Sequence, residues 1–69
     1  MNRKTELENA IADLIKRRQA TYRLRHDVKI AILKGDKHEW LPLTLEESAK
    51  DLQRMNRVLR SLREELKGL

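Results

Sequence analysis

The sequence has no cysteine, no phenylalanine, only two glycines, one proline and no long apolar run. Without cysteine the chain forms neither a disulfide nor a thiolate zinc site. Without about 18 consecutive apolar residues it has no candidate transmembrane helix, and Met1 is followed by a charged pattern in place of the apolar core of a signal peptide. We therefore expect a cytoplasmic protein that makes no membrane contact.

Catalytic and cofactor-binding motifs are also missing. The sequence contains no glycine-rich phosphate loop and no pair of histidines at helical spacing, and neither His26 nor His38 belongs to a recognisable catalytic triad. Asp36, His38 and Glu39 are residue types that bind metals, but three such residues on one connector are more often simply solvated. The sequence therefore predicts a protein that is not an enzyme and that has no catalytic residue, no cofactor and no metal site.

A long amphipathic pattern without glycine or proline predicts a first helix over residues 5–34. Thr5 and Glu8 have the Thr-x-x-Glu spacing of a capping box, in which each side chain accepts a hydrogen bond from the other residue's backbone amide. Gly35 follows at the point where a left-handed residue ends a helix. The first helix therefore has both a start signal and a stop signal.

A second amphipathic pattern predicts a helix over residues 44–67, with Pro42 before it and a capping box that begins at Thr44. The connector then covers residues 35–43, and a connector of this length favours antiparallel neighbours. The predicted fold is an all-α, antiparallel two-helix hairpin that forms a single domain over residues 1–69.

Apolar residues spaced by threes and fours predict the faces on which the two helices meet. In the first helix a seven-residue repeat begins at Leu7, and its companion positions include Leu24. A hairpin that folds about residue 39 or 40 places Val28 opposite Leu52 and Leu24 opposite Met55. The residues that we assign to the core and to self-association are Leu7, Ile11, Leu14, Leu24, Val28, Leu52, Met55, Leu59, Leu62 and Leu66.

The apolar stripes are wider than one neighbouring helix can cover. Exposed apolar rows mark interaction surfaces, and a chain of 69 residues without disulfides gains stability by self-association. Two hairpins that pack as an isologous four-helix bundle, or another coiled-coil assembly, would cover the rows. We expect a homodimer. The candidate surface for this or another protein partner is Ile15, Tyr22, Ile30 and Trp40, although Trp40 is also a candidate to fold back and cap the core.

Positive charge is concentrated in two segments that an antiparallel hairpin brings to similar heights. Residues 16–29 contain six Lys or Arg and one acid, and residues 52–63 contain four arginines and no acid. Such a belt is either a solvated surface or a surface that contacts phosphates. The candidate nucleic-acid contacts are Arg17, Arg18, Arg25, Arg57 and Arg60.

Three observations weigh against nucleic acid as the partner. Asp13, Asp27 and Asp51 are close to the belt in sequence or in the expected hairpin and would repel phosphate. No base-reading motif is present, and the stacking aromatics of single-strand binders are missing. The arginines that interrupt the first stripe, Arg17 and Arg18, are expected instead to pair with carboxylates near residues 64 and 65 or with an acidic partner helix.

In architecture the chain resembles the small RNA-binding plasmid copy-number regulators, which are antiparallel dimers of helical hairpins. In size, basicity and helical content it also resembles the small accessory proteins encoded in the early regions of lambda-like bacteriophages. The second resemblance implies a host-modulating role. From the residues themselves we expect a small regulator or adaptor that acts through protein–protein contacts, with a nucleic-acid-binding hairpin as the alternative.

Overall fold

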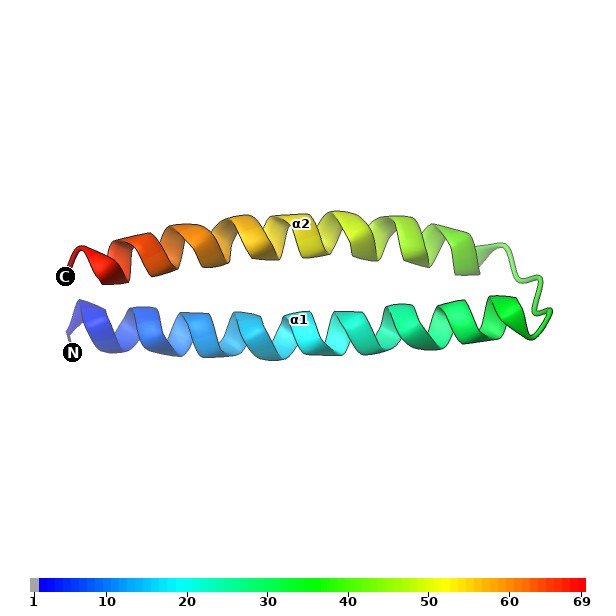
Figure 1. Cartoon of the computed structure of the whole chain (residues 1–69), viewed down its shortest axis with the longest axis horizontal. Coiled ribbons are helices and arrows are strands. Elements are labelled where there is room, and N and C mark those ends of the chain that lie inside the picture. The colour runs from blue at the N-terminus through cyan, green and yellow to red at the C-terminus, as the bar shows by residue number, and fades with distance from the viewer. Residues whose placement is uncertain (1) are drawn as a thin grey trace.

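Two helices account for nearly all of residues 2–69, the part of the chain that the computed structural model describes. α1 spans Arg3–Leu33 and α2 spans Trp40–Lys67. The two helices lie side by side and run antiparallel, with both chain ends at one end of the hairpin and the connector at the other (Figure 1). Residues 2–69 contain no strand. The predicted all-α hairpin is confirmed.

α1 begins earlier than its predicted capping box. Its N-cap is Asn2, whose side-chain oxygen accepts a 2.8 Å hydrogen bond from the amide of Thr5. Thr5 is therefore inside the first turn, and the prediction that it caps the helix is wrong. The expected stop is confirmed: Gly35 has φ +92°, its amide donates to Ile32 O, and the next amide donates to Ala31 O, both at 3.0 Å. This pair of bonds is the Schellman motif.

α2 also begins earlier than predicted, at Trp40 instead of residue 44. The Thr44 hydroxyl donates to Trp40 O at 2.8 Å, so Thr44 is a helical residue and not an N-cap. Pro42 lies in the first turn, where amides have no partner within the helix and a missing N–H costs nothing. The connector therefore shrinks to residues 34–39. Trp40 does not cap the core: its side chain is 55% exposed, whereas its neighbour Leu41 is fully buried.

The two helices meet along rows whose spacing alternates between four and three residues, which is the heptad pattern of a coiled coil. Every residue in these seam rows is buried or half-buried. On α1 the companion row is displaced by one residue from the predicted one, so that it contains Arg18 and Arg25 in place of Arg17 and Leu24. The seam rows are Leu7, Ile11, Leu14, Arg18, Thr21, Arg25 and Val28 on α1, and Leu41, Leu45, Ser48, Leu52, Met55, Leu59, Leu62 and Leu66 on α2.

The register of the hairpin differs from the predicted one by about two helical turns. Arg25 binds Ser48, although the predicted register places residues near Met55 at that level. Arg18 binds Asn56 in the same register. The cause is the early start of α2, which moves the turning point of the chain from residues 39–40 to the shorter connector. The pairing of Val28 with Leu52 and of Leu24 with Met55 is therefore wrong.

The buried apolar core is small. It consists of Leu7, Val28, Leu41, Leu52 and Leu59. Of the predicted core residues, Ile11, Leu14, Met55, Leu62 and Leu66 are half-buried, and Leu24 is 46% exposed and lies outside the hairpin core. The chain exposes 5691 Å², whereas a compact monomer of this size exposes roughly 4500 Å². The hairpin measures 50 × 15 × 14 Å, so it is a thin rod with little interior.

Candidate functional site

Two polar clusters interrupt the apolar seam near its middle. The Arg25 guanidinium donates to Leu45 O and, at 3.0 Å, to Ser48 Oγ. Ser48 is only 4% exposed, and its hydroxyl donates in turn to Leu45 O. One heptad away on α1, Arg18 donates to Asn56 Oδ1 at 3.2 Å. Long arginine stems cover apolar surface while their guanidinium groups reach acceptors, and buried polar groups favour one register over others. The part-buried Arg25–Ser48 cluster therefore favours the observed alignment, and the exposed Arg18–Asn56 bond is consistent with the same alignment.

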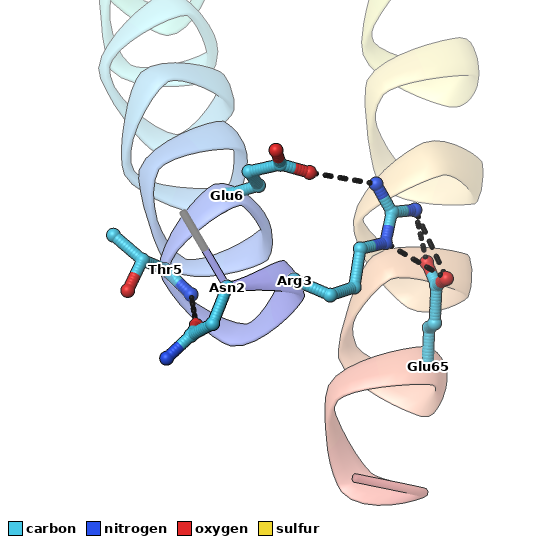
Figure 2. A network of polar contacts seen from close by, with 5 residues as sticks. All are labelled: Asn2, Arg3, Thr5, Glu6 and Glu65. Atoms are coloured by element: carbon cyan, nitrogen blue, oxygen red, sulfur yellow. Dashed lines mark hydrogen bonds and ion pairs between the residues drawn. The ribbon is translucent and has the colours of Figure 1, made fainter.

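An ion pair closes the end of the hairpin where the two chain ends lie (Figure 2). Arg3 donates through two nitrogens to the carboxylate of Glu65, with a shortest distance of 2.8 Å, and a third nitrogen reaches Glu6 at 3.4 Å. The hydrogen bonds and charge of Glu65 raise the pKa of the Arg3 guanidinium above its ordinary value. Because that pKa is raised, the stabilisation is present throughout the physiological range and is lost only as pH rises above the ordinary arginine pKa. Glu65 thus pairs with Arg3 and not, as the sequence suggested, with Arg17 or Arg18.

On each helix, the rows of residues next to the seam rows lie on one or the other broad face of the hairpin. The hairpin therefore has two long sides. We call one the arginine side. Its charged residues are Lys29, Arg60, Arg63 and Lys67, with the acids Glu8 and Glu46. We call the other the acidic side, and its charged residues are the acids Glu6, Asp13, Asp27, Glu47, Asp51 and Glu65, with the bases Arg3, Arg17 and Arg54. The two sides of this basic chain therefore carry opposite net charge.

A shallow groove runs along the arginine side. Arg18 and Leu59 belong to its floor in the seam, and the remaining lining residues come from α2: Asn56, Arg60, Arg63, Glu64 and Lys67. A neighbouring hollow on the same helix continues it with Gln53 and Arg57. Among the described residues, none of Arg57, Arg60, Arg63 and Lys67 forms an ion pair within the hairpin. The groove is therefore open to anionic groups.

A smaller and more apolar hollow lies on the opposite side, near the connector. The exposed side chains of Leu24, Trp40 and Leu43 line it, and Glu47 and Asp51 stand at its rim. The Trp40 ring stacks on the His38 ring, with 6.1 Å between centroids. This hollow combines apolar area with negative charge, which is the opposite chemistry to the arginine groove.

The structure divides the five arginines that the sequence nominated for nucleic-acid contact. Arg60 and Arg57 lie along the arginine groove, and Arg18 is in its floor. Arg25 is part-buried and bonded to α2, and Arg17 belongs to the acidic side. Arg63 was counted in the arginine-rich segment 52–63 but was not nominated as a contact, and Lys67 was missed. Their signal was the four-and-three spacing of α2, which places both residues beside the seam row that contains Leu59 and Leu66.

The four residues nominated as a partner surface do not form one patch. Ile15 is half-buried, and Tyr22 is 52% exposed one heptad further along the arginine side. Ile30 lies on the outer face of α1, and Trp40 belongs to the acidic side. Each long side thus has its own exposed apolar residues, Tyr22 on one and Leu24, Val58 and Trp40 on the other.

Three further observations concern chemistry and membranes. Over residues 2–69 the structure contains no group of three or more His, Asp or Glu that could hold a metal ion. The connector residues Asp36 and His38 lie 3.4 Å apart as an exposed pair. In the same part of the chain, neither helix is long and apolar enough to cross a membrane.

No protein-family model, no curated protein and no solved structure matches the chain.

Proposed function

We propose that this chain is a small, non-enzymatic helical regulator or adaptor that acts through protein–protein contacts, and that its first contact is with another copy of itself. The observation that carries the proposal is the excess of exposed surface. The hairpin exposes 5691 Å², about 1200 Å² more than a compact monomer of its size. Exposed aromatic and aliphatic side chains, among them Tyr22, Leu24 and Val58, lie on both long sides.

Two hairpins together carry about 2400 Å² of this excess, which is more than an interface of standard size has to cover. A specific protein–protein interface of standard size buries about 1200–2000 Å² in total. Packing two hairpins together gives a four-helix bundle, in which apolar residues beside each seam become buried. Burial of apolar area is the main driving force for such association. Self-association thus supplies the interior that one thin hairpin lacks.

Sedimentation velocity over a range of protein concentrations tests the proposal, with circular dichroism recorded on the same samples. We expect the sedimentation coefficient to rise with concentration while the helical signal stays high. A chain that remains a folded monomer at high micromolar concentration would contradict self-association. A chain that is poorly helical until a different protein is added would show that its partner is not itself.

Nucleic-acid binding is the second candidate, because three aspartates that the sequence placed beside the basic belt lie on the other side of the hairpin, and Glu64 is the one acid among the residues that line the arginine groove. Asp13, Asp27 and Asp51 all belong to the acidic side, so they do not repel phosphate at the groove. Binding to the groove predicts an affinity for RNA or DNA that falls steeply with salt, with each lost phosphate contact lowering the log–log slope by about one.

A matched pair of variants tests this candidate by fluorescence anisotropy with labelled RNA and DNA. Arg60→Gln with Arg63→Gln removes charge from the groove, whereas the control Arg17→Gln with Arg54→Gln removes the same charge from the acidic side. Weaker binding by the first variant alone supports the groove. Equal losses in both variants would show a general charge effect, and no binding at low salt would exclude the candidate.

A further inference from the structure

The two long sides of the hairpin differ in charge sign as well as in residue type, and this difference determines how copies can meet. The arginine side has four bases and two acids, and the acidic side has six acids and three bases. When the same side of two copies meets, whichever way the copies point, the two surfaces carry net charge of the same sign, which opposes association. We propose that the copies associate heterologously, with the arginine side of one hairpin on the acidic side of the next. This proposal rests on the proposed self-association and specifies its geometry.

Residues on the two sides also match in height along the hairpin. Tyr22 on the arginine side and Leu24 on the acidic side are two residues apart on α1, or roughly 3 Å along the helix axis. Lys29 and Asp27 are likewise two residues apart on α1 and on opposite sides. Consider a second copy that is displaced perpendicular to the plane of the two helix axes, with little shift along those axes. Its Leu24 then meets Tyr22 of the first copy, and its Asp27 meets Lys29.

α2 repeats this arrangement. Arg63 belongs to the arginine side and Glu65 to the acidic side, again roughly 3 Å apart along the axis. In the hairpin Glu65 binds Arg3, and a carboxylate can accept from more than one guanidinium. The matched pairs are therefore spread from the Glu65 end of the hairpin toward the connector, so the contact uses most of the rod. All the hairpins in such an assembly point the same way.

Apolar contact supplies the driving force and charge supplies the orientation. Tyr22 and Leu24 are each about half exposed in the single hairpin, at 52% and 46%, and both become buried in this contact. Ion pairs at the rim of an interface contribute little affinity but select partners and orientation. A heterologous contact closes into a ring if its rotation allows and otherwise continues as an open stack. An isologous dimer, in contrast, stops at two copies.

Two variants with opposite sides disabled test the proposal by sedimentation velocity. Tyr22→Glu with Lys29→Glu places acids on the arginine side. Leu24→Lys with Asp27→Lys places bases on the acidic side. All four side chains are exposed in the hairpin, so the helical signal should be retained, and circular dichroism checks it. We expect each variant alone to require at least about tenfold higher concentration to associate, because its altered side then presents like charges to the unaltered side of the next copy of the same variant.

An equimolar mixture of the two variants decides the geometry, because each variant retains the side that the other has lost. We expect the mixture to associate at concentrations where both separate variants are monomers. If the Leu24 variant alone still dimerises and the Tyr22 variant does not, the contact is isologous through the arginine side, and the reverse result indicates the acidic side. Either result overturns the heterologous contact but retains self-association. A wild-type chain that is monomeric throughout would overturn the proposed function itself.

Where a double variant loses helicity, the single changes Lys29→Glu and Asp27→Lys replace it. Each single change should also weaken association, by a smaller factor than the double variant, and mixing the two single variants should restore association. Raising the salt concentration should weaken wild-type association, because exposed ion pairs are screened. Association that is unchanged in both single variants and in their mixture would show that charge does not orient the contact.

Discussion

Two leucines that the sequence treats alike should differ sharply in what they contribute to stability. Leu59 is 2% exposed and Leu24 is 46% exposed. Truncating a buried leucine to alanine costs about 2–5 kcal/mol, because apolar burial is lost and a cavity is left. For Leu24→Ala we expect less than about 1 kcal/mol, since roughly half of the side chain is already in water and no closed cavity forms. A hairpin of this length has a total stability of only about 3–10 kcal/mol.

Urea denaturation followed by circular dichroism measures both changes, at protein concentrations below the onset of association. We expect Leu59→Ala to lower the midpoint strongly or to abolish the transition, and Leu24→Ala to leave it nearly unchanged. At higher concentrations the effect of Leu24→Ala should grow, because Leu24 lies on the proposed contact surface. Equal losses in the two variants at low concentration would refute the seam rows described above, because they would place Leu24 in the hairpin core.

Three further predictions concern the turn at Gly35, the Arg25–Ser48 cluster in the seam and the ion pair between Arg3 and Glu65. Gly35→Ala should lower the free energy of unfolding by about 1 kcal/mol, because alanine is strained at the φ of +92° that Gly35 adopts. An added Cβ would meet no other atom, so the cost is conformational. The control Gly68→Ala, at φ −78°, should be nearly neutral. Arg25→Leu should be less destabilising in a Ser48→Ala background than in the wild type, because the two side chains share a hydrogen bond. The charge reversal Arg3→Glu should destabilise the hairpin, and adding Glu65→Arg should restore part of the loss.

Each of these predictions has a result that contradicts it, measured as the midpoint of thermal or urea unfolding. Gly35→Ala and Gly68→Ala with equal effects would mean that the left-handed turn does not matter to stability. Additive effects of the Arg25 and Ser48 changes would show that the buried cluster is not coupled. A loss at Arg3 that is neither rescued by the swap nor reduced in 1 M salt would indicate a role other than the exposed ion pair.

The general fold could be predicted because its signals are local. The two amphipathic patterns and the left-handed glycine at residue 35 specify two helices and a turn, and the structure contains all three. The helix starts could not be placed as well. Asn2 and Thr5 are both good capping types, and Pro42 is compatible with a position before a helix or inside its first turn. Sequence alone does not decide between such neighbouring solutions.

The register was missed because a leucine-rich seam looks the same after a shift of one heptad. What distinguishes the two alignments is the position of polar partners. From the sequence, Arg18 was interpreted as an interruption of the stripe and Arg25 as a candidate nucleic-acid contact. In the structure these arginines occupy the seam because Asn56 and Ser48 supply acceptors at their levels. Predicting this required matching donors to acceptors across the helices in addition to matching apolar residues.

The candidate surfaces depended on the register and were therefore only partly predictable. The arginine-rich segments were evident from composition, but their division into two sides follows from the seam rows. Arg17 and Arg18 are adjacent in sequence and yet belong to different parts of the molecule. The separation of acids from bases depends on which face of each helix lies in the seam.

The position of both chain ends at one end of the hairpin (Figure 1) has a mechanical consequence. A force that pulls the two ends apart loads the seam one layer at a time, beginning at the ion pair between Arg3 and Glu65, so the helices unzip from this end toward the connector. A force applied between the connector and either end pulls along one helix instead of peeling the helices apart. If the hairpin is tethered by its ends, it should open at low tension and close again from the intact turn at Gly35.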